Sequence, residues 1–214
     1  MVVSQDQFDI LAPKNGQVED LLDALVKKAK IPSEDEAGPI RVYEVSNHKF
    51  FRELDRNYPV ISINEYTTVV AERIPAEEVG LNDPAQFISV FQFHGEPSRA
   101  HGIPFRFLIK EGEMFSETKK RLEKRTGLKG KSFEKIKFAV VRRAQFSRPQ
   151  YLTDGKQATP HPQHFLGHAG LAANGVADDI LWDVAQNSDD ILGMDHPDRT
   201  RSVRNGAGDL FLKG

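Results

Sequence analysis

A change in the spacing of hydrophobic residues marks positions 87–127. Two apolar stretches of period two, 87–93 and 105–109, flank a short polar loop that ends at Gly102-Ile103-Pro104. Glu111-Gly112-Glu113 then interrupts the pattern, and hydrophobic residues recur at helical spacing until a glycine ends the region. Period two, a turn, period two and then a period of 3.6 predict a strand, a strand and a helix in that order.

A related pattern occurs earlier in the chain. Hydrophobic residues at helical spacing predict a helix over 18–30, and its acidic first turn and lysine-rich last turn complement the helix dipole. A short strand is predicted before this helix, at 8–11, and an acidic loop after it, at 33–38. The next segment predicts a hairpin that turns at Asn47-His48, followed by a strand at 66–73 rich in β-branched residues.

A hairpin followed by a crossing helix is how a ubiquitin-like β-grasp domain begins. We therefore predict an α+β chain of two tandem ubiquitin-like β-grasp domains, the first at 1–80 without most of its first strand and the second at 86–197. A tail follows at 198–214. Within the second domain, residues 153–177 change to Gly, Ala, Pro, His and Gln without periodicity, which predicts an inserted flexible loop. The other elements expected in this domain are a strand at 137–141, a short helical turn at 178–182 and a final strand at 191–196.

Composition narrows the function classes. The chain has 214 residues and no cysteine, so it contains no disulfide, no thiolate zinc site and no cysteine nucleophile. No stretch approaches the roughly 18 apolar residues of a membrane span, and no secretory signal is visible at the N-terminus. We expect an intracellular protein without a membrane partner.

The net charge of −2 hides an uneven distribution. Residues 106–148 carry a net charge of +9, whereas residues 1–100 carry −7 and residues 149–214 carry −4. A basic middle between acidic flanks is typical of a nucleic-acid surface, but equally of a helix face that docks on an acidic protein partner. The residues of this possible basic surface are Lys119, Lys120, Arg121 and Lys124. Nucleic acid is the less favoured partner, because no aromatic residues are interleaved with the charges.

Several polar clusters were weighed as chemical sites. His161, His164 and His168 have a spacing that could bind zinc on a helix, but Pro160 and Pro162 oppose a helix there and no carboxylate completes the site. The other clusters considered are His94 and His101 with Ser98, Glu96 and Asp195 for acid–base catalysis, Asp178-Asp179 and Asp189-Asp190 for calcium, and Asn205 to Gly208 for a dinucleotide. None has the partners or spacing that its chemistry requires. We therefore predict no catalytic site, no metal and no cofactor in this chain.

Several motifs together resemble one family. Phe93-His94 and Gly102-Ile103-Pro104-Phe105, in collinear order with other segments along the chain, resemble the C-terminal region of the herpesvirus-associated ubiquitin-specific protease. The other similar segments are 111–113, 119–122, 133–139 and 192–196 in the second half, and 40–53 and 71–75 in the first. The tail segment 204–210 resembles the fungal branch. An inserted loop at 153–177 and glycines at 206 and 208, where animal tails are bulkier, depart from the family pattern.

The resemblance implies a place for this chain in a larger protein. In that family five ubiquitin-like domains follow a papain-like catalytic domain, which hydrolyses isopeptide bonds to ubiquitin with a Cys, His, Asp triad. This chain would be the last two domains and the tail, without the triad. It would act as a regulatory module that favours the active arrangement of the catalytic domain and binds other protein partners, in the nucleus and cytoplasm.

The tail is the expected contact with the catalytic domain. An apolar cluster near the end is preceded by three arginines, and so short a cluster cannot pack by itself into a domain. The residues expected to bind the partner are Arg199, Arg201, Arg204, Leu210, Phe211 and Leu212. A disordered terminus without a role is the alternative.

Overall fold

The structure of the chain is a computed structural model. It describes residues 6–81, 83–142, 148–154, 170–171, 177–185 and 189–198. The predicted tail contacts all lie outside the described residues, as do His161, His164 and His168.

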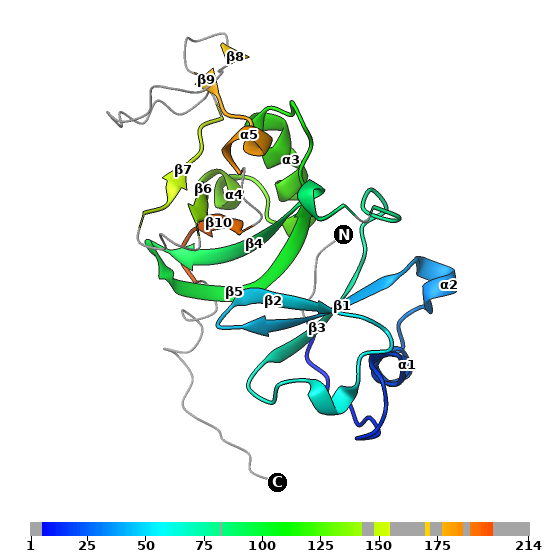
Figure 1. Cartoon of the computed structure of the whole chain (residues 1–214). Coiled ribbons are helices and arrows are strands. Elements are labelled where there is room, and N and C mark those ends of the chain that lie inside the picture. The colour runs from blue at the N-terminus through cyan, green and yellow to red at the C-terminus, as the bar shows by residue number, and fades with distance from the viewer. Residues whose placement is uncertain are drawn as a thin grey trace.

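The first unit packs a helix on a three-stranded antiparallel sheet (Figure 1). Its elements are α1 (Val18–Ala29), α2 (Glu34–Ala37), β1 (Ile40–Ser46), β2 (Lys49–Leu54), the 3-10 turn η1 (Val60–Ser62) and β3 (Thr68–Arg73). The strand order is β2-β1-β3. The helix predicted at 18–30 is confirmed, and so is the hairpin turn, where Asn47 and His48 both have positive φ angles (49° and 59°). Two such residues match the twist of a two-residue hairpin.

Two expectations for this unit were wrong. Residues 8–11 form no strand, and the Lys28 ammonium instead donates to the carbonyl of Asp9 alongside α1. The physical reason is pairing: an extended segment becomes a strand only when its backbone groups meet a neighbour, and no described segment lies beside this one as a strand. The acidic loop at 33–38 contains a short helix, α2, because Ser33 and Glu36 close a reciprocal cap at its start.

The second unit is a complete β-grasp. It contains η2 (Pro84–Gln86), β4 (Phe87–His94), β5 (Glu96–Leu108), α3 (Phe115–Thr126), α4 (Lys131–Glu134), β6 (Lys137–Arg142), β7 (Gln150–Tyr151), α5 (Leu181–Val184) and β10 (Asp190–Asp195). The strand order is β5-β4-β10-β6-β7, with β10 parallel to β4 and antiparallel to β6. The α+β ubiquitin-like fold is thus confirmed, as are the helix, the strand at 137–141 and the final strand predicted here. The helical turn expected at 178–182 lies a few residues later, at Leu181–Val184, and Asp178 belongs to a two-residue strand instead.

The polar loop expected before Gly102 is instead strand. β5 begins at Glu96, directly after a tight turn at Gly95 (φ 73°), and follows β4 with two register shifts. Those irregularities hide the period-two pattern in the sequence. The predicted loop at 153–177 lies mostly outside the described residues; within it, β8 (Gly170–Leu171) pairs with β9 (Ala177–Asp178).

Each unit has its own hydrophobic core, and the core of the second unit is the larger. In the second unit thirteen buried residues, among them Phe107, Phe115 and Leu192, pack between α3 and the sheet. In the first unit five buried residues, among them Val18 and Leu22 of α1, pack against the inner face of its sheet. No described helix is long and apolar enough to cross a membrane.

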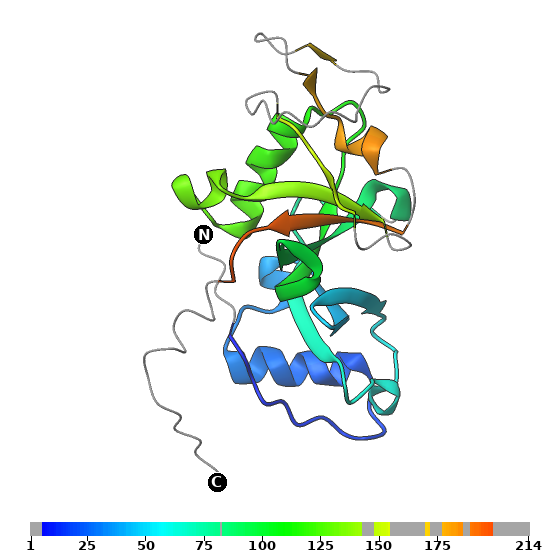
Figure 2. The ribbon, with the colours of Figure 1, turned by 90° about the vertical axis from the view of Figure 1, so that its left-hand side faces the viewer.

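The outer faces of the two sheets meet, so that both sheets lie between α1 and α3 (Figures 1 and 2). β2 approaches β4 and β5 across this interface. Tyr43 is 1% exposed and donates from its hydroxyl to the carbonyl of Pro104 at 2.8 Å, and His48 Nδ1 lies 2.8 Å from the carbonyl of Gly102. The two units are therefore packed against each other.

Candidate functional site

The side chains weighed for catalysis make local contacts. His101 is buried, and its Nε2 lies 3.0 Å from the carbonyl oxygen of His196, with the two rings edge to face at 4.9 Å. Asp195 accepts hydrogen bonds from the Gly95 N–H at 2.8 Å and from the Tyr151 hydroxyl at 2.7 Å. Burial and the Asp195 carboxylate both raise the pKa of Tyr151. These contacts tie the end of β10 to its neighbours.

His94 and Ser98 are not hydrogen-bonded to each other as a base and a nucleophile would be. His94 is exposed at the end of β4, and the Ser98 hydroxyl donates to Glu96 at 3.4 Å. Among the described residues, no three His, Asp or Glu side chains gather as metal ligands.

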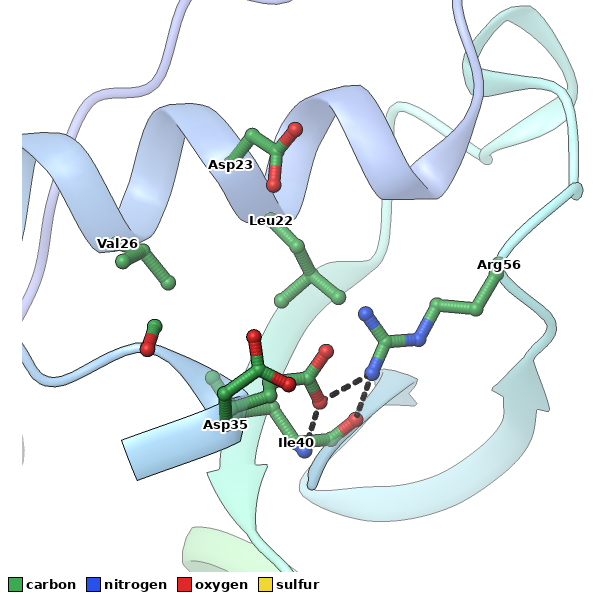
Figure 3. A pocket seen from close by; sticks show the side chains of 8 residues that line it. Leu22, Asp23, Val26, Asp35, Ile40 and Arg56 are labelled. Atoms are coloured by element: carbon green, nitrogen blue, oxygen red, sulfur yellow. Dashed lines mark hydrogen bonds and ion pairs between the residues drawn. The ribbon is translucent and has the colours of Figure 1, made fainter. Parts of the chain in front are cut away.

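A shallow cavity of about 220 Å³ lies in the first unit, between α1, α2 and the start of β1 (Figure 3). Leu22 and Val26 of α1 supply apolar walls, and Arg56 crosses the opposite side, where it donates to Glu34 and to the carbonyl of Ile40. Burial raises the pKa of Glu34, but hydrogen bonds from Arg56 and from the Ile40 N–H outweigh it and lower that pKa. Arg56 and Glu34 therefore neutralise each other at neutral pH.

The four residues of the possible basic surface differ in their surroundings. Lys119 pairs with Asp154 at 2.9 Å and its side chain is 17% exposed, while Arg121 pairs with Glu113 and donates to the carbonyl of Leu108. The other two, Lys120 and Lys124, are exposed, and Lys120 pairs with Glu117 one helical turn away. The structure thus presents two of the four to solvent and turns two inward.

The strongest polar cluster lies where the two units meet. Arg41, on the outer face of β1, is 5% exposed and contacts three carboxylates: Glu53 at 3.5 Å, Glu72 at 3.0 Å and Glu78 at 3.0 Å. Glu78 belongs to the connector between the units, and its side chain is 1% exposed. Burial raises the pKa of Glu78 more than the Arg41 guanidinium lowers it.

The second unit supplies cations to the same carboxylates. Arg106 of β5 reaches Glu53 at 2.7 Å, and Arg125 of α3 reaches Glu72 at 2.6 Å. Aromatic rings lie beside the guanidinium groups: Arg106 is 4.3 Å and Arg41 6.0 Å from the ring centre of Phe87. Sequence reasoning missed this cluster. The signal was a buried-strand pattern in which Arg41 and Tyr43 alternate with core residues and so share the outer face.

Comparison with known proteins identifies the family. Residues 2–201 match the family described as ubiquitin-specific protease C-terminal. The chain belongs to this family. Ubiquitin carboxyl-terminal hydrolase 15 of Schizosaccharomyces pombe is 32% identical over 202 residues, which cover 94% of this chain and 16% of that protein.

A plant and an insect carry similar proteins. Ubiquitin C-terminal hydrolase 12 of Arabidopsis thaliana is 32% identical over 152 residues, 68% of this chain and 13% of that protein. Ubiquitin carboxyl-terminal hydrolase 7 of Drosophila melanogaster is 30% identical over 155 residues, 65% of this chain and 14% of that protein. The chain spans about one sixth or less of the length of these relatives. The resemblance seen in the sequence is confirmed: this is the non-catalytic C-terminal region of a ubiquitin-specific protease.

Proposed function

We propose that this chain is the regulatory and partner-binding module of a cysteine-type deubiquitinase and that it activates the upstream catalytic domain. The observation that carries this proposal is the match to the ubiquitin-specific protease C-terminal family over residues 2–201, in a chain without cysteine. The parent protein then supplies the Cys, His, Asp triad and acts in the nucleus and cytoplasm, as the resemblance implies. The protein partners of this chain include that catalytic domain.

The proposed organisation is a β-grasp domain at 1–80, a second at 86–197 and a regulatory tail at 198–214. The tail's Leu210, Phe211 and Leu212 would enter a groove of the catalytic domain, and its arginines would orient the encounter. Burying one such apolar side chain stabilises a complex by roughly 1.5–3 kcal/mol, less the cost of ordering the tail. Two or three of them are enough to shift a catalytic domain that rests mostly inactive, provided that they bind the active state more tightly.

The test adds this chain in trans to the matching catalytic domain and measures turnover of a fluorogenic ubiquitin substrate. We expect stimulation by the full chain, and loss of most of it on removal of residues 199–214 or in Phe211→Ala. Ser202→Ala, in the same segment, is the matched control and should stimulate normally. The absence of stimulation by the full chain would contradict the activating role, and a Phe211→Ala chain that stimulates fully would contradict the role of the tail.

A second candidate function is a stand-alone module that binds nucleic acid or acidic proteins through Lys119, Lys120, Arg121 and Lys124. The ion pairs of Lys119 and Arg121 weaken its support, since paired cations have less charge to offer a second partner.

A further inference from the structure

We propose that the end of β10 forms a tail-root clamp, which fixes the place and the direction in which the chain leaves the second unit toward its tail. The effect of this clamp on a catalytic domain rests on the proposed function of the tail, but the clamp itself lies within the described residues. It consists of Asp195 and His196 and of the residues that bind them, which are Phe93, Gly95, His101 and Tyr151.

Asp195 holds the end of β10 from two sides. One of its carboxylate oxygens accepts from the Gly95 N–H at 2.8 Å, in the turn between β4 and β5. The other oxygen accepts from the hydroxyl of Tyr151 at 2.7 Å, and Tyr151 belongs to β7, which is separated from β10 by β6. Hydrogen bonds to a charged acceptor are stronger than those between neutral groups. A single carboxylate therefore links β10 both to the β4–β5 turn and to the edge strand of the sheet.

The next residue, His196, is held through its backbone. Its N–H donates to the carbonyl of Phe93 at 2.9 Å, one residue beyond the end of β10. Its carbonyl oxygen lies 3.0 Å from His101 Nε2, and because a carbonyl only accepts, this nitrogen must carry the proton. His101 is 8% exposed, so water competes little for this hydrogen bond. Both backbone polar groups of His196 thus have partners in β4 and β5.

These contacts lie where a terminal strand ordinarily frays. The last fully buried side chain of β10 is that of Met194, whereas Asp195 and His196 are only partly buried. Residues beyond the packed core at the end of a domain are ordered only where specific contacts hold them. Burial of apolar surface therefore does not hold these two residues in place, and their hydrogen bonds do.

Pro197 extends the restraint by one residue. A proline ring fixes its own φ at about −65° and keeps the preceding residue out of helical conformations. Each residue spans at most about 3.6 Å, so the backbone of Arg199 lies within about 7 Å of Pro197, whereas Leu210 can lie up to about 45 Å away. The clamp thus positions the arginines near the root of the tail far more closely than the apolar end of the tail.

A clamp of this kind strengthens the binding of the tail without touching the catalytic domain. Residues that are fixed before binding need not be ordered during it, so their ordering cost is not subtracted from the affinity. Loss of the clamp should raise the concentration of chain that gives half-maximal stimulation and leave the maximum unchanged, because the tail's own contacts remain. A purely structural role in the sheet would instead lower the midpoint of urea unfolding and leave the half-maximal concentration of folded chain unchanged. Tyr151 and His101 are thus positioning residues for the tail.

Hydrogen exchange tests whether the clamp holds the root of the tail. The clamp variant, Tyr151→Phe with His101→Phe, removes two donors and keeps an aromatic ring at each position. By NMR of the full chain we expect the His196 amide to exchange at least about tenfold faster than in the unmodified chain, while amides in the middle of β10 keep their rates. The matched control, Tyr66→Phe with His94→Phe, makes the same changes at exposed residues and should alter neither. Equal exchange of His196 in the clamp variant and in the control would overturn the proposal.

Stimulation of the matching catalytic domain in trans tests the consequence. We expect the clamp variant to need at least about three times the control's concentration for half-maximal stimulation, with the same maximum and the same unfolding midpoint. If the clamp variant does not fold, Tyr151→Phe alone, at a residue that is 40% exposed, replaces it in both measurements with the same direction of change. His101→Gln, whose amide can still donate to the His196 carbonyl, should behave as the control does.

The two measurements separate this proposal from the proposed function. A folded clamp variant with fast exchange at His196 but the control's half-maximal concentration would overturn the positioning role of the clamp. The absence of stimulation by the unmodified chain would contradict the proposed function, and the exchange rates would then decide the clamp by themselves.

Discussion

At the scale of single residues, two buried carboxylates, Glu44 of the first unit and Glu78 of the connector, have pKa values shifted in opposite directions. Glu44 is fully buried in β1, yet its pKa lies below the ordinary value: burial raises it, but hydrogen bonds from Thr67, Arg52 and the Asn64 N–H outweigh that effect. Glu78 shares one arginine with two other carboxylates, and burial raises its pKa. The number of donors that each carboxylate faces decides the difference.

Glu44→Gln should therefore destabilise the chain in a pH-dependent way. The ionised Glu44 accepts from Thr67 Oγ1 at 2.7 Å and from the Asn64 N–H at 3.0 Å, and it pairs with Arg52. Hydrogen bonds to a charged group contribute about 1.5–3 kcal/mol, so we expect a loss of that size in the free energy of unfolding near pH 7. Because the folded-state pKa is lowered, this stability is present above the unfolded pKa and is lost as pH falls through the folded pKa.

Urea unfolding near pH 7 and again near pH 3 measures both parts of this prediction. Glu65→Gln, an exposed neighbour, is the control and should change little at either pH. A loss from Glu44→Gln that is equally large at both pH values would show that the carboxylate's charge is not what stabilises the unit.

At the scale of elements, β3 and β10 occupy equivalent places in their units but differ in how many strands flank them. Each pairs antiparallel with the strand that follows the helix of its unit, β1 or β6. On its other side β10 pairs in parallel with β4, whereas β3 has no strand partner among the described residues. Five of the six residues of β10 are buried, and none of the six in β3 is fully buried. The edge of β3 is thus suited to accept a parallel strand.

This difference predicts the hydrogen exchange of the two strands. The β3 amides that point away from β1 should exchange faster than those of β10 by about tenfold or more, because local opening exposes few buried contacts there. Addition of the polypeptide that precedes this region in the parent protein should slow them, if a strand from it joins the sheet. Native-state exchange followed by mass spectrometry or NMR measures both. Equal protection of β3 and β10 in this chain would rule out an open edge.

The elements also show where sequence reasoning succeeds. Helices α1 and α3 were predictable because amphipathic spacing and end charges act within the segment itself. The segment at 8–11 has the right composition for a strand, yet strand formation depends on a partner elsewhere. The start of β5 was missed because bulges break its alternation. The Arg41 cluster depends on packing between units, which no local pattern records.

At the scale of the whole molecule, the uneven charge of the sequence has a structural explanation. The sequence favoured an acidic protein partner over nucleic acid for the basic middle, but it could not say which partner, because that depends on what lies opposite α3 and β5. In the structure Arg106, Arg121 and Arg125 face carboxylates of the first unit and the connector. Much of the positive charge is thus balanced inside the chain, and the exposed remainder on α3 is centred on Lys120 and Lys124.

The chain should consequently bind nucleic acid only weakly. Affinity for a polyanion depends on the number of cations that release counterions, and each phosphate contact contributes a slope of about −0.9 to the dependence of log K on log salt for duplex DNA. We expect retention of a labelled duplex at low salt, a shallow slope, and loss of binding near physiological salt. Fluorescence anisotropy across a salt series measures all three.

Charge reversal at the two exposed lysines of α3 tests whether they cause any binding that remains at low salt. Lys120→Glu with Lys124→Glu should abolish the low-salt retention, since these side chains are open to solvent, whereas Asp35→Lys on the distant α2 should not abolish it. Neither variant alters an ion pair between the two units, so the fold should stay unchanged. Tight binding at physiological salt that Lys120→Glu with Lys124→Glu removes would instead make nucleic acid a true partner.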